Sequence, residues 1–250
     1  MRIITRRSMI AGVAGLMLAG AAHAADTQVA VAANFTEPAK EIAVAFAKAT
    51  GHNAVLNFGS SGAFYTQMAH GAPFEVFLSA DADRPKKAEQ DGLAVPGSRF
   101  TYAIGRLVLY STTPGLVDEG GGVLKRGGFA RISIADPTAA PYGTAAVQTM
   151  RKLGVYPTLA PKIVKGTSIT QAYQFVATGA AELGFVALSQ VITQPGGSRW
   201  LVPASLHSPI DQQAVLLWTG AKNPAAQAFM KYLRTPAAIA IVKRYGYATR

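Results

Sequence analysis

Hydrophobic residues along the chain follow two patterns: short continuous runs, and runs in which apolar positions recur every three or four residues. The continuous runs are typical of buried strands, and the spaced runs, such as Ile42, Phe46 and Ala49, are typical of amphipathic helices. The predicted strands are residues 28–33, 54–58, 75–79, 100–110, 132–135, 162–164, 182–188 and 214–219. The predicted helices are residues 38–49, 63–70, 84–90, 143–153, 169–178, 225–233 and 237–245.

The order of these elements predicts an α/β protein. Strands separated by single helices form βαβ units, whose parallel sheets are covered by helices on both faces. Two such sets are visible, one before about Arg106 and one over residues 132–188. Ligands of open α/β sheets bind beyond the carboxyl ends of the strands, so the turns that lead from a strand into the next helix are the candidate functional sites.

Four strand-to-helix turns have similar compositions. Hydroxyl and amide side chains in these turns can donate hydrogen bonds, and glycines let a ligand approach the backbone. Each following helix also presents unpaired N–H groups and a partial positive charge at its start. The turns are Ala-Asn-Phe-Thr, Gly-Ser-Ser-Gly, Ala-Pro-Tyr-Gly and Gly-Thr-Ser-Ile, over residues 33–36, 59–62, 140–143 and 166–169, and none contains a charged residue.

Two interpretations of these turns are open. Each turn can simply cap its helix, since Asn34 with Glu37 and Ser168 with Gln171 fit the capping box. Taken together, the turns predict an anion site made of uncharged donors, with Ser61 as the main donor of the second turn. A site without acceptors favours a fully ionised tetrahedral oxyanion over a protonated one, whose O–H group would find no partner.

The N-terminal residues 1–24 have the pattern of a secretory signal peptide. A basic segment is followed by a short apolar run and then by Ala22-His23-Ala24, a cleavage site of small residues. We expect cleavage after Ala24 and export to the periplasm by the Sec route or, given Arg6-Arg7, by the twin-arginine route. No later segment is long and apolar enough to span a membrane, and the chain has no cysteine.

The basic charge of the chain does not indicate nucleic-acid binding. The formal net charge is +11, and removal of the leader, which carries three arginines and no acid, lowers it to +8. The densest basic cluster, Arg84, Lys86 and Lys87, is short and is followed by Glu89 and Asp91. Because no basic run is interleaved with aromatic residues, we predict no nucleic-acid partner.

An enzymatic function has weak support in the sequence. The segment from Gly59 to Gly62 is not a nucleophile elbow, because position 63 is alanine. Asp81 and Asp83 follow the third predicted strand, and we interpret them as helix caps rather than metal ligands. The mature chain has three histidines, at positions 52, 70 and 207, all outside the four turns. A secreted hydrolase using Ser61 or Asp81 remains the weaker alternative, and no cofactor-binding fingerprint is present.

Several motifs, in order along the chain, resemble those of the periplasmic molybdate-binding proteins of ABC importers. The resemblance covers essentially the whole mature chain. It implies an α/β type II periplasmic-binding-protein fold with two lobes, each a mixed, mostly parallel sheet flanked by helices, and a ligand in the cleft between the lobes. The motifs are AANFTEPAKEIAVAFAKATGH, FGSSGAFYTQMAHGAPFEVFLSAD, SRFTYAIGRLVLYS, APYGTAA and AELGFVALSQ.

The same resemblance implies a domain division and a function. Residues 25–105 and 212–250 would form lobe one, and residues 106–211 would form lobe two. The protein would be a monomeric, non-enzymatic receptor that captures molybdate and tungstate and delivers them to the membrane permease of an ABC importer. A receptor for sulfate, phosphate or another oxyanion is the alternative.

The resemblance also assigns ligand contacts, all as hydrogen-bond donors to the oxyanion, with no cofactor and no separate metal site. Asn34 stands where another branch of the family has serine, so its side-chain amide would donate in place of a hydroxyl unless Asn34 contacts the ligand by its backbone. Some relatives use a tyrosine hydroxyl near the position of Ala187, which is absent here, so Tyr142 is the expected phenol donor. The primary residues are Ala33, Asn34, Ser61, Tyr142 and the backbone N–H of Ile169; the secondary ones are Phe35, Ser60, Ser168 and Ala187.

Overall fold

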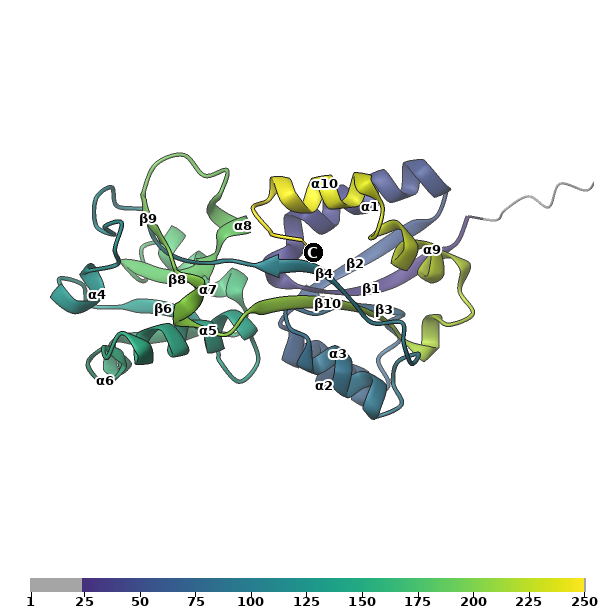
Figure 1. The fold of residues 1–250 in the computed structure, drawn as a ribbon, viewed down its shortest axis with the longest axis horizontal. Helices are drawn as coiled ribbons and strands as arrows, with labels where there is room; N and C mark the ends of the chain where they lie inside the picture. Colours follow the sequence, from purple (N-terminus) through teal and green to yellow (C-terminus); the bar gives the residue numbers. More distant parts are fainter. Residues whose placement is uncertain (1–23, 250) are drawn as a thin grey trace, which may run out of the picture.

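A computed structural model describes residues 24–249, in which two five-stranded sheets lie side by side, each with helices on both faces (Figure 1). The predicted leader therefore lies outside the described residues, except for Ala24. Among the described residues, no helix is long and apolar enough to cross a membrane. The expected two-lobed α/β architecture is confirmed.

The first lobe is built on a sheet of strand order β2-β1-β3-β10-β4. The central strand β1 pairs in parallel with β2 and β3, and β10 runs against β3 and β4, so four strands point one way. The strands are β1 (Asp26–Ala32), β2 (Asn53–Gly59), β3 (Val76–Leu78), β4 (Phe100–Gly105) and β10 (Ile210–Leu216).

Two layers of helices cover this sheet. On one face, Ile42 and Phe46 of the first helix pack with Phe229 near the C-terminus, and on the other face Phe64 and Met68 pack against Phe77. The helices of the first face are α1 (Thr36–Thr50), α9 (Pro224–Tyr232) and α10 (Pro236–Arg244), and those of the second are α2 (Ser61–Ala69) and α3 (Asp83–Gln90). Two 3₁₀ turns, η1 (Ala33–Phe35) and η4 (Trp218–Gly220), precede α1 and α9.

The second lobe repeats this plan with strand order β7-β6-β8-β5-β9. Here β5 runs against its neighbours β8 and β9, while β6 pairs in parallel with β7 and β8. Its strands are β5 (Leu107–Ser111), β6 (Ile132–Ala135), β7 (Ile163–Gly166), β8 (Leu183–Ala187) and β9 (Ser198–Leu201). Its helices are α4 (Val123–Arg126), α5 (Pro141–Lys152), α6 (Tyr156–Leu159), α7 (Ile169–Ala177) and α8 (Leu188–Val191), with 3₁₀ turns η2 (Ala160–Lys162) and η3 (Ala204–Leu206).

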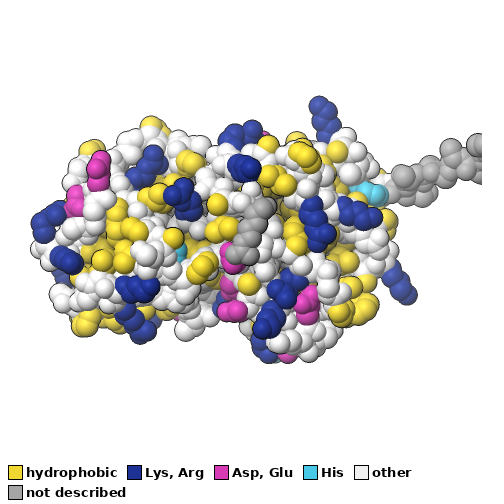
Figure 2. Space-filling view, viewed as in Figure 1, with side chains coloured by type: hydrophobic (Ala, Val, Ile, Leu, Met, Phe, Trp, Pro, Cys, Tyr) yellow, Lys and Arg dark blue, Asp and Glu magenta, His cyan; other side chains and the backbone are white. Residues whose placement is uncertain are grey.

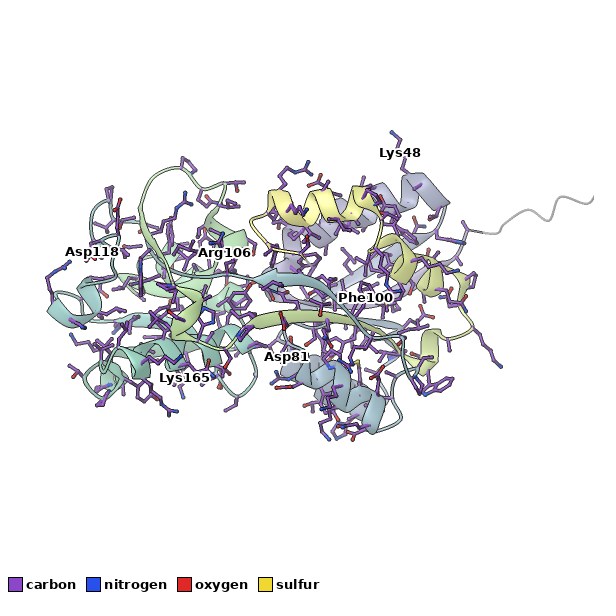
Figure 3. All side chains as sticks on the ribbon, in the orientation of Figure 1. Lys48, Asp81, Phe100, Arg106, Asp118 and Lys165 are labelled. Atoms are coloured by element: carbon purple, nitrogen blue, oxygen red, sulfur yellow. The ribbon has the colours of Figure 1, made fainter. Side chains whose placement is uncertain are left out.

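The chain crosses between the two sheets at two places. The apolar run 100–110, predicted as one strand, is two strands in different sheets, and Arg106 is the single residue between them (Figure 3). The chain returns after β9, and β10 begins at Ile210 rather than at the predicted residue 214. Strand β9 and the short helices α4, α6 and α8 were not predicted, because each has only four residues and no clear apolar period.

Candidate functional site

The four turns singled out in the sequence meet at one small cavity between the two lobes. It holds about 200 Å³ of space not filled by atoms, part of it open to solvent, so it suits a small ion rather than a larger ligand. In the described part of the chain, no charged side chain lines this cavity. The lining residues are Ala32, Ala33, Asn34, Gly59, Ser60, Ser61, Ala80, Ala140, Pro141, Tyr142 and Ile169.

The predicted residues divide into two groups. The five primary residues all line the cavity, and so does Ser60 among the secondary ones. Phe35, Ser168 and Ala187 do not. The Phe35 ring is fully buried against Tyr102, and the N–H of Ala187 donates to Gln190 Oε1 at 3.0 Å.

Two serines open helix α2 at the cavity. Ser60 is the N-cap, and its Oγ accepts a long hydrogen bond from the Ala63 N–H at 3.4 Å. Ser61 is the first helical residue, and its Oγ accepts from the Ala80 N–H at 2.9 Å. Among the described residues neither hydroxyl donates to a protein acceptor, so each hydroxyl proton is available for a ligand.

Asn34 lines the cavity as expected, but its side-chain amide has partners within the protein. Its Nδ2 donates to Gln212 Oε1 and to the Tyr247 hydroxyl, both at 2.9 Å, so both amide protons are engaged inside the protein. The capping box with Glu37 is also absent: Phe35 is the N-cap of α1 and no side chain caps it, while Glu37 pairs with Lys40. The amide is thus occupied within the protein, and the backbone N–H of Asn34 is the group left for the contact that the resemblance assigns to this residue, which stays a prediction.

Tyr142 brings a hydroxyl and a backbone N–H to the third turn. It is the second residue of α5, after Pro141, so its N–H is among those that have no partner within the helix. Its side chain is buried, and its hydroxyl oxygen accepts from Gln212 Nε2 at 3.1 Å.

The fourth turn is capped much as predicted. The Oγ of Ser168 accepts from the Gln171 N–H at 3.3 Å, as in a capping box. The reciprocal bond goes from the Thr167 N–H to Gln171 Oε1 at 2.6 Å, one residue earlier than the motif requires. Ser168 is thus a cap, and Ile169, the first residue of α7, presents the open N-terminus of the helix to the cavity.

Electrostatically, the site consists of neutral donors. Burial raises the pKa of Tyr142 well above its ordinary value, with smaller contributions from Tyr247 and Tyr102, so the phenol stays protonated. Positive potential comes from the converging N-termini of η1, α2, α5 and α7 rather than from cations. Such a site binds a compact dianion by hydrogen bonds and offers little to a ligand that must itself donate.

The two lobes touch around this cavity. The Gly62 N–H donates to the Ala139 carbonyl at 2.9 Å, and Arg84 Nη2 donates to the Thr138 carbonyl at 3.0 Å. On the other side, Ser189 Oγ donates to the Asn34 carbonyl at 2.8 Å. The structure is therefore in a closed arrangement, with hydrogen bonds between the lobes on both sides of the cavity.

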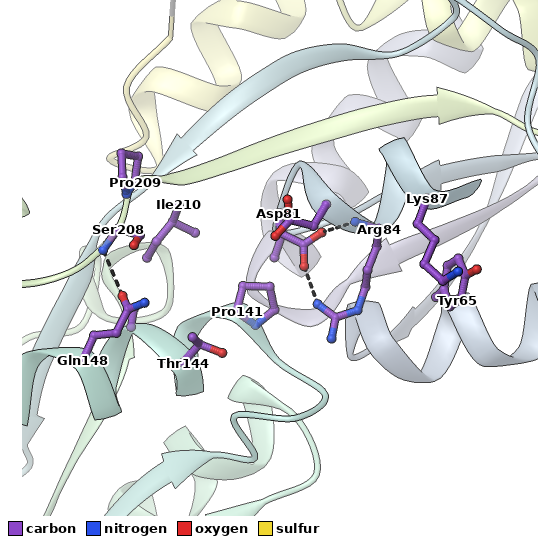
Figure 4. Close-up of a pocket in the computed structure, with 13 residues that line it drawn as sticks. Tyr65, Asp81, Arg84, Lys87, Pro141, Thr144, Gln148, Ser208, Pro209 and Ile210 are labelled. Atoms are coloured by element: carbon purple, nitrogen blue, oxygen red, sulfur yellow. Dashed lines mark hydrogen bonds and ion pairs between the residues drawn. The ribbon is translucent and has the colours of Figure 1, made fainter. Parts of the chain in front are cut away.

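A larger groove lies beside the cavity and shares Ala80 and Pro141 with it (Figure 4). Asp81 lies in this groove, where it forms an ion pair with Arg84 and accepts the Arg84 N–H at 3.0 Å (Figure 4). Neither predicted residue is the N-cap of α3, which is Ala82, but Asp81 accepts an N–H of the first helical turn, and Asp83 is the first residue of the helix. No cluster of three or more His, Cys, Asp or Glu side chains able to hold a metal occurs within residues 24–249.

Several residues around the site were not predicted. Gln212, Tyr247, Ser189 and Tyr102 form a buried hydrogen-bond network behind Asn34. Gln212, Tyr247 and Tyr102 lie far from Asn34 in sequence and outside the strand-to-helix turns, so no local pattern marks them. Ser189 lies in the first turn of α8, directly after β8, but this short helix was not predicted.

Comparisons with known proteins agree with this geometry. The family described as "Bacterial extracellular solute-binding protein" matches residues 27–248. The chain is 58% identical over 240 residues to the molybdate-binding protein ModA of Rhodobacter capsulatus, covering 96% of this chain and 94% of that one. It is 57% identical to ModA of Azotobacter vinelandii, with 96% of each chain covered. A solved structure, the periplasmic molybdate-binding protein of Azotobacter vinelandii, superposes with a TM-score of 0.87 at 45% identity, covering 90% of this chain and 99% of that chain.

Proposed function

The chain belongs to the bacterial extracellular solute-binding proteins, and we propose that it captures molybdate in the interlobe cavity and hands it to the permease of an ABC importer. The observation that carries the proposal is the uncharged cavity itself, which is lined by residues at the starts of four helices, and three of these residues bear hydroxyl groups. As a member of this family the protein is a binding protein and not an enzyme.

The proposed contacts come from every turn. Ser61 and Tyr142 donate through their hydroxyls, and the backbone N–H groups of Asn34, Tyr142 and Ile169 donate from the helix starts. Ala33 contributes its backbone, and Ser60 can add its hydroxyl. Tungstate has the same charge and shape as molybdate, so we propose that it binds in the same way.

The function is tested by calorimetric titration of the mature protein with molybdate, tungstate, sulfate and phosphate. We expect one site per chain for molybdate and tungstate. Sulfate should bind far more weakly, because its shorter bonds leave some donors out of reach, and hydrogen phosphate should be rejected because its O–H finds no acceptor. Equal affinities for molybdate and sulfate would contradict the proposed selectivity, and saturable binding of phosphate alone would indicate a different receptor.

Molybdate is also expected to stabilise the protein against heat. At 100 times its dissociation constant, a ligand that binds only the folded state adds about 2.7 kcal/mol to the free energy of unfolding. For a protein of this length that corresponds to a rise in Tm of roughly 5–10 °C. Differential scanning fluorimetry with sulfate at the same concentration as the control checks this, and an equal rise with both anions would contradict it.

We propose that binding closes the cleft. Lobe one would comprise residues 25–105 and the segment from β10 to the C-terminus, lobe two the chain between them, and the hinge would lie at Arg106 and just before Ile210. Each lobe alone offers only half of the donors, so the anion favours the state in which both reach it. X-ray scattering should show the protein becoming more compact on adding molybdate.

The contact between Arg84 and the Thr138 carbonyl should contribute to affinity without touching the ligand. Arg84→Met removes a hydrogen bond made only in the closed state, and we expect molybdate affinity to fall about 2- to 10-fold. Lys87→Met is the matched control, because Lys87 forms an ion pair with Asp91 inside lobe one and this pair does not connect the two lobes. Equal affinities of the two variants in titration would rule out this closing contact.

We also propose that the protein is periplasmic and monomeric. It would be exported by the Sec or twin-arginine route and cleaved after Ala24. The periplasmic relative from Azotobacter vinelandii supports the location. Lysines and arginines are scattered over the face seen in Figure 2, which fits a soluble surface better than a nucleic-acid interface.

A further inference from the structure

Gln212 lies directly behind the cavity but does not line it. The residue is fully buried on β10, and the register between β10 and β4 shifts between Gln212 and Gln213. Bulges of this kind redirect side chains and are frequent next to functional sites. Its Oε1 lies 2.9 Å from Asn34 Nδ2 and 3.1 Å from the Tyr102 hydroxyl, and its Nε2 lies 3.1 Å from the Tyr142 hydroxyl.

The hydrogen bonds around Gln212 have a fixed direction. The Asn34 carbonyl can only accept, so the Tyr247 hydroxyl donates to it at 2.7 Å. The Tyr247 oxygen then accepts from Asn34 Nδ2, whose second proton goes to Gln212 Oε1. The Gln212 amide is thereby oriented with its Nε2 toward Tyr142, to which it donates.

Gly105 makes the contact between Gln212 and Tyr142 possible. A Cβ at this position would lie 2.3 Å from the Tyr142 hydroxyl and 2.6 Å from Gln212 Nε2. The end of β4 is therefore open where these two groups meet, and any larger residue would separate them.

We infer that Gln212 is a positioning residue that sets the direction of the Tyr142 hydroxyl: its Nε2–H donates to the phenol oxygen, so the phenol proton points away from Gln212, where the anion can accept it. This inference rests on the proposed function. The phenol oxygen then has less capacity to accept a proton from a ligand, as the Ser61 oxygen does beside the Ala80 N–H and the Ser60 oxygen beside the Ala63 N–H. The Tyr142 side chain also interacts with Tyr247, so the anion would take over this proton on binding. Discrimination against protonated anions would then depend on groups that never touch the ligand.

The groups that face Gln212 remain neutral over the working pH range. The titratable ones within the described chain are Tyr102 from β4, Tyr142 from α5 and Tyr247 after α10. Burial raises the pKa of all three, and the charge of Asp81 adds to the effect at Tyr102. Any pH dependence introduced at position 212 therefore comes from the substituted residue.

The test is Gln212→Glu. An ionised carboxylate accepts the Tyr142 proton and repels the dianion, so we expect molybdate affinity at pH 8 to fall about 10- to 100-fold. A protonated carboxyl can donate to the phenol oxygen as the amide does, which restores the site. Binding then takes up a proton, and affinity should recover by up to tenfold per unit of falling pH, while the wild type stays nearly flat between pH 6 and 8.

Two further variants separate positioning from a structural role. Gln212→Met removes the donor without adding charge. Its loss of molybdate affinity should therefore be smaller than that of Gln212→Glu and should not depend on pH. In a Tyr142→Phe background, Gln212→Met should reduce molybdate affinity much less than it does in the wild type. A double-mutant cycle, with affinities measured by titration, tests this. This cycle decides the question if Gln212→Glu does not fold.

The outcomes are distinguishable. If the wild type does not bind molybdate, the proposed function fails. If the wild type binds, a pH-independent loss in Gln212→Glu, or additive losses in the cycle, would overturn the role of Gln212 and leave the function intact.

Discussion

Replacing Ser61 with alanine is expected to weaken molybdate binding by about 1.5–3 kcal/mol, because it removes a hydrogen bond to a charged ligand. The Ser61 side chain is almost fully buried, and its oxygen also accepts from the Ala80 N–H at 2.9 Å. The substitution therefore leaves that N–H without its partner and is expected to lower the free energy of unfolding of the ligand-free protein by about 1–3 kcal/mol as well.

Ser60→Ala is the matched control. Ser60 lines the same cavity, but its oxygen caps α2 through a longer bond of 3.4 Å. Loss of this cap is expected to cost about 1 kcal/mol of stability, with a clearly smaller loss of affinity. Titration and thermal unfolding of both variants separate the two effects. A larger loss of affinity in Ser60→Ala would show that the first serine, not the second, is the main donor.

The strand-to-helix turns could be located from sequence because the signals are local. Continuous apolar runs such as Ile132–Ala135 mark buried strands, and small polar residues such as Ser61 and Ser168 begin the helices that follow. The rule that ligands bind beyond the carboxyl ends of strands then placed the four turns at one site, as the structure does.

The crossing of the lobes could not be predicted in the same way. Residues 100–110 form a nearly unbroken apolar run, yet the structure divides it between two sheets at Arg106. Side chains are buried on both sides of Arg106, so the spacing of apolar residues does not mark the division between the two strands. Only the pairing partners, β10 for one half and β8 and β9 for the other, define the division.

The role of Asn34 shows a second limit. Locally, Asn34 followed by Glu37 resembles a capping box, and only the folded structure brings Gln212 and Tyr247 to its amide. These partners lie 178 and 213 residues away. A buried polar side chain takes whichever partners the tertiary fold offers, and here those partners take the place of the local cap.

Gly143→Ala is expected to lower the free energy of unfolding by about 3 kcal/mol and to weaken molybdate binding at the same time. Gly143 lies in the first turn of α5, and a Cβ there would lie 2.1 Å from the Ala135 carbonyl oxygen and 2.8 Å from its carbon. Both atoms are backbone at the end of β6, so they cannot rotate away, and the helix must move off the sheet. That movement carries Pro141 and Tyr142 away from the cavity.

Gly120→Ala is the control for this substitution, because a Cβ there meets only Asp118 Oδ1, at 3.6 Å. Its stability should stay within about 0.5 kcal/mol of the wild type. For Gly143→Ala we expect Tm to fall by roughly 6–12 °C in differential scanning calorimetry. We also expect a smaller rise of Tm on adding molybdate than in the wild type, because the third turn no longer reaches the anion. A Gly143→Ala protein that melts and binds like Gly120→Ala would mean that α5 is not seated against β6 as described, and the position of Tyr142 in the site would have to be revised with it.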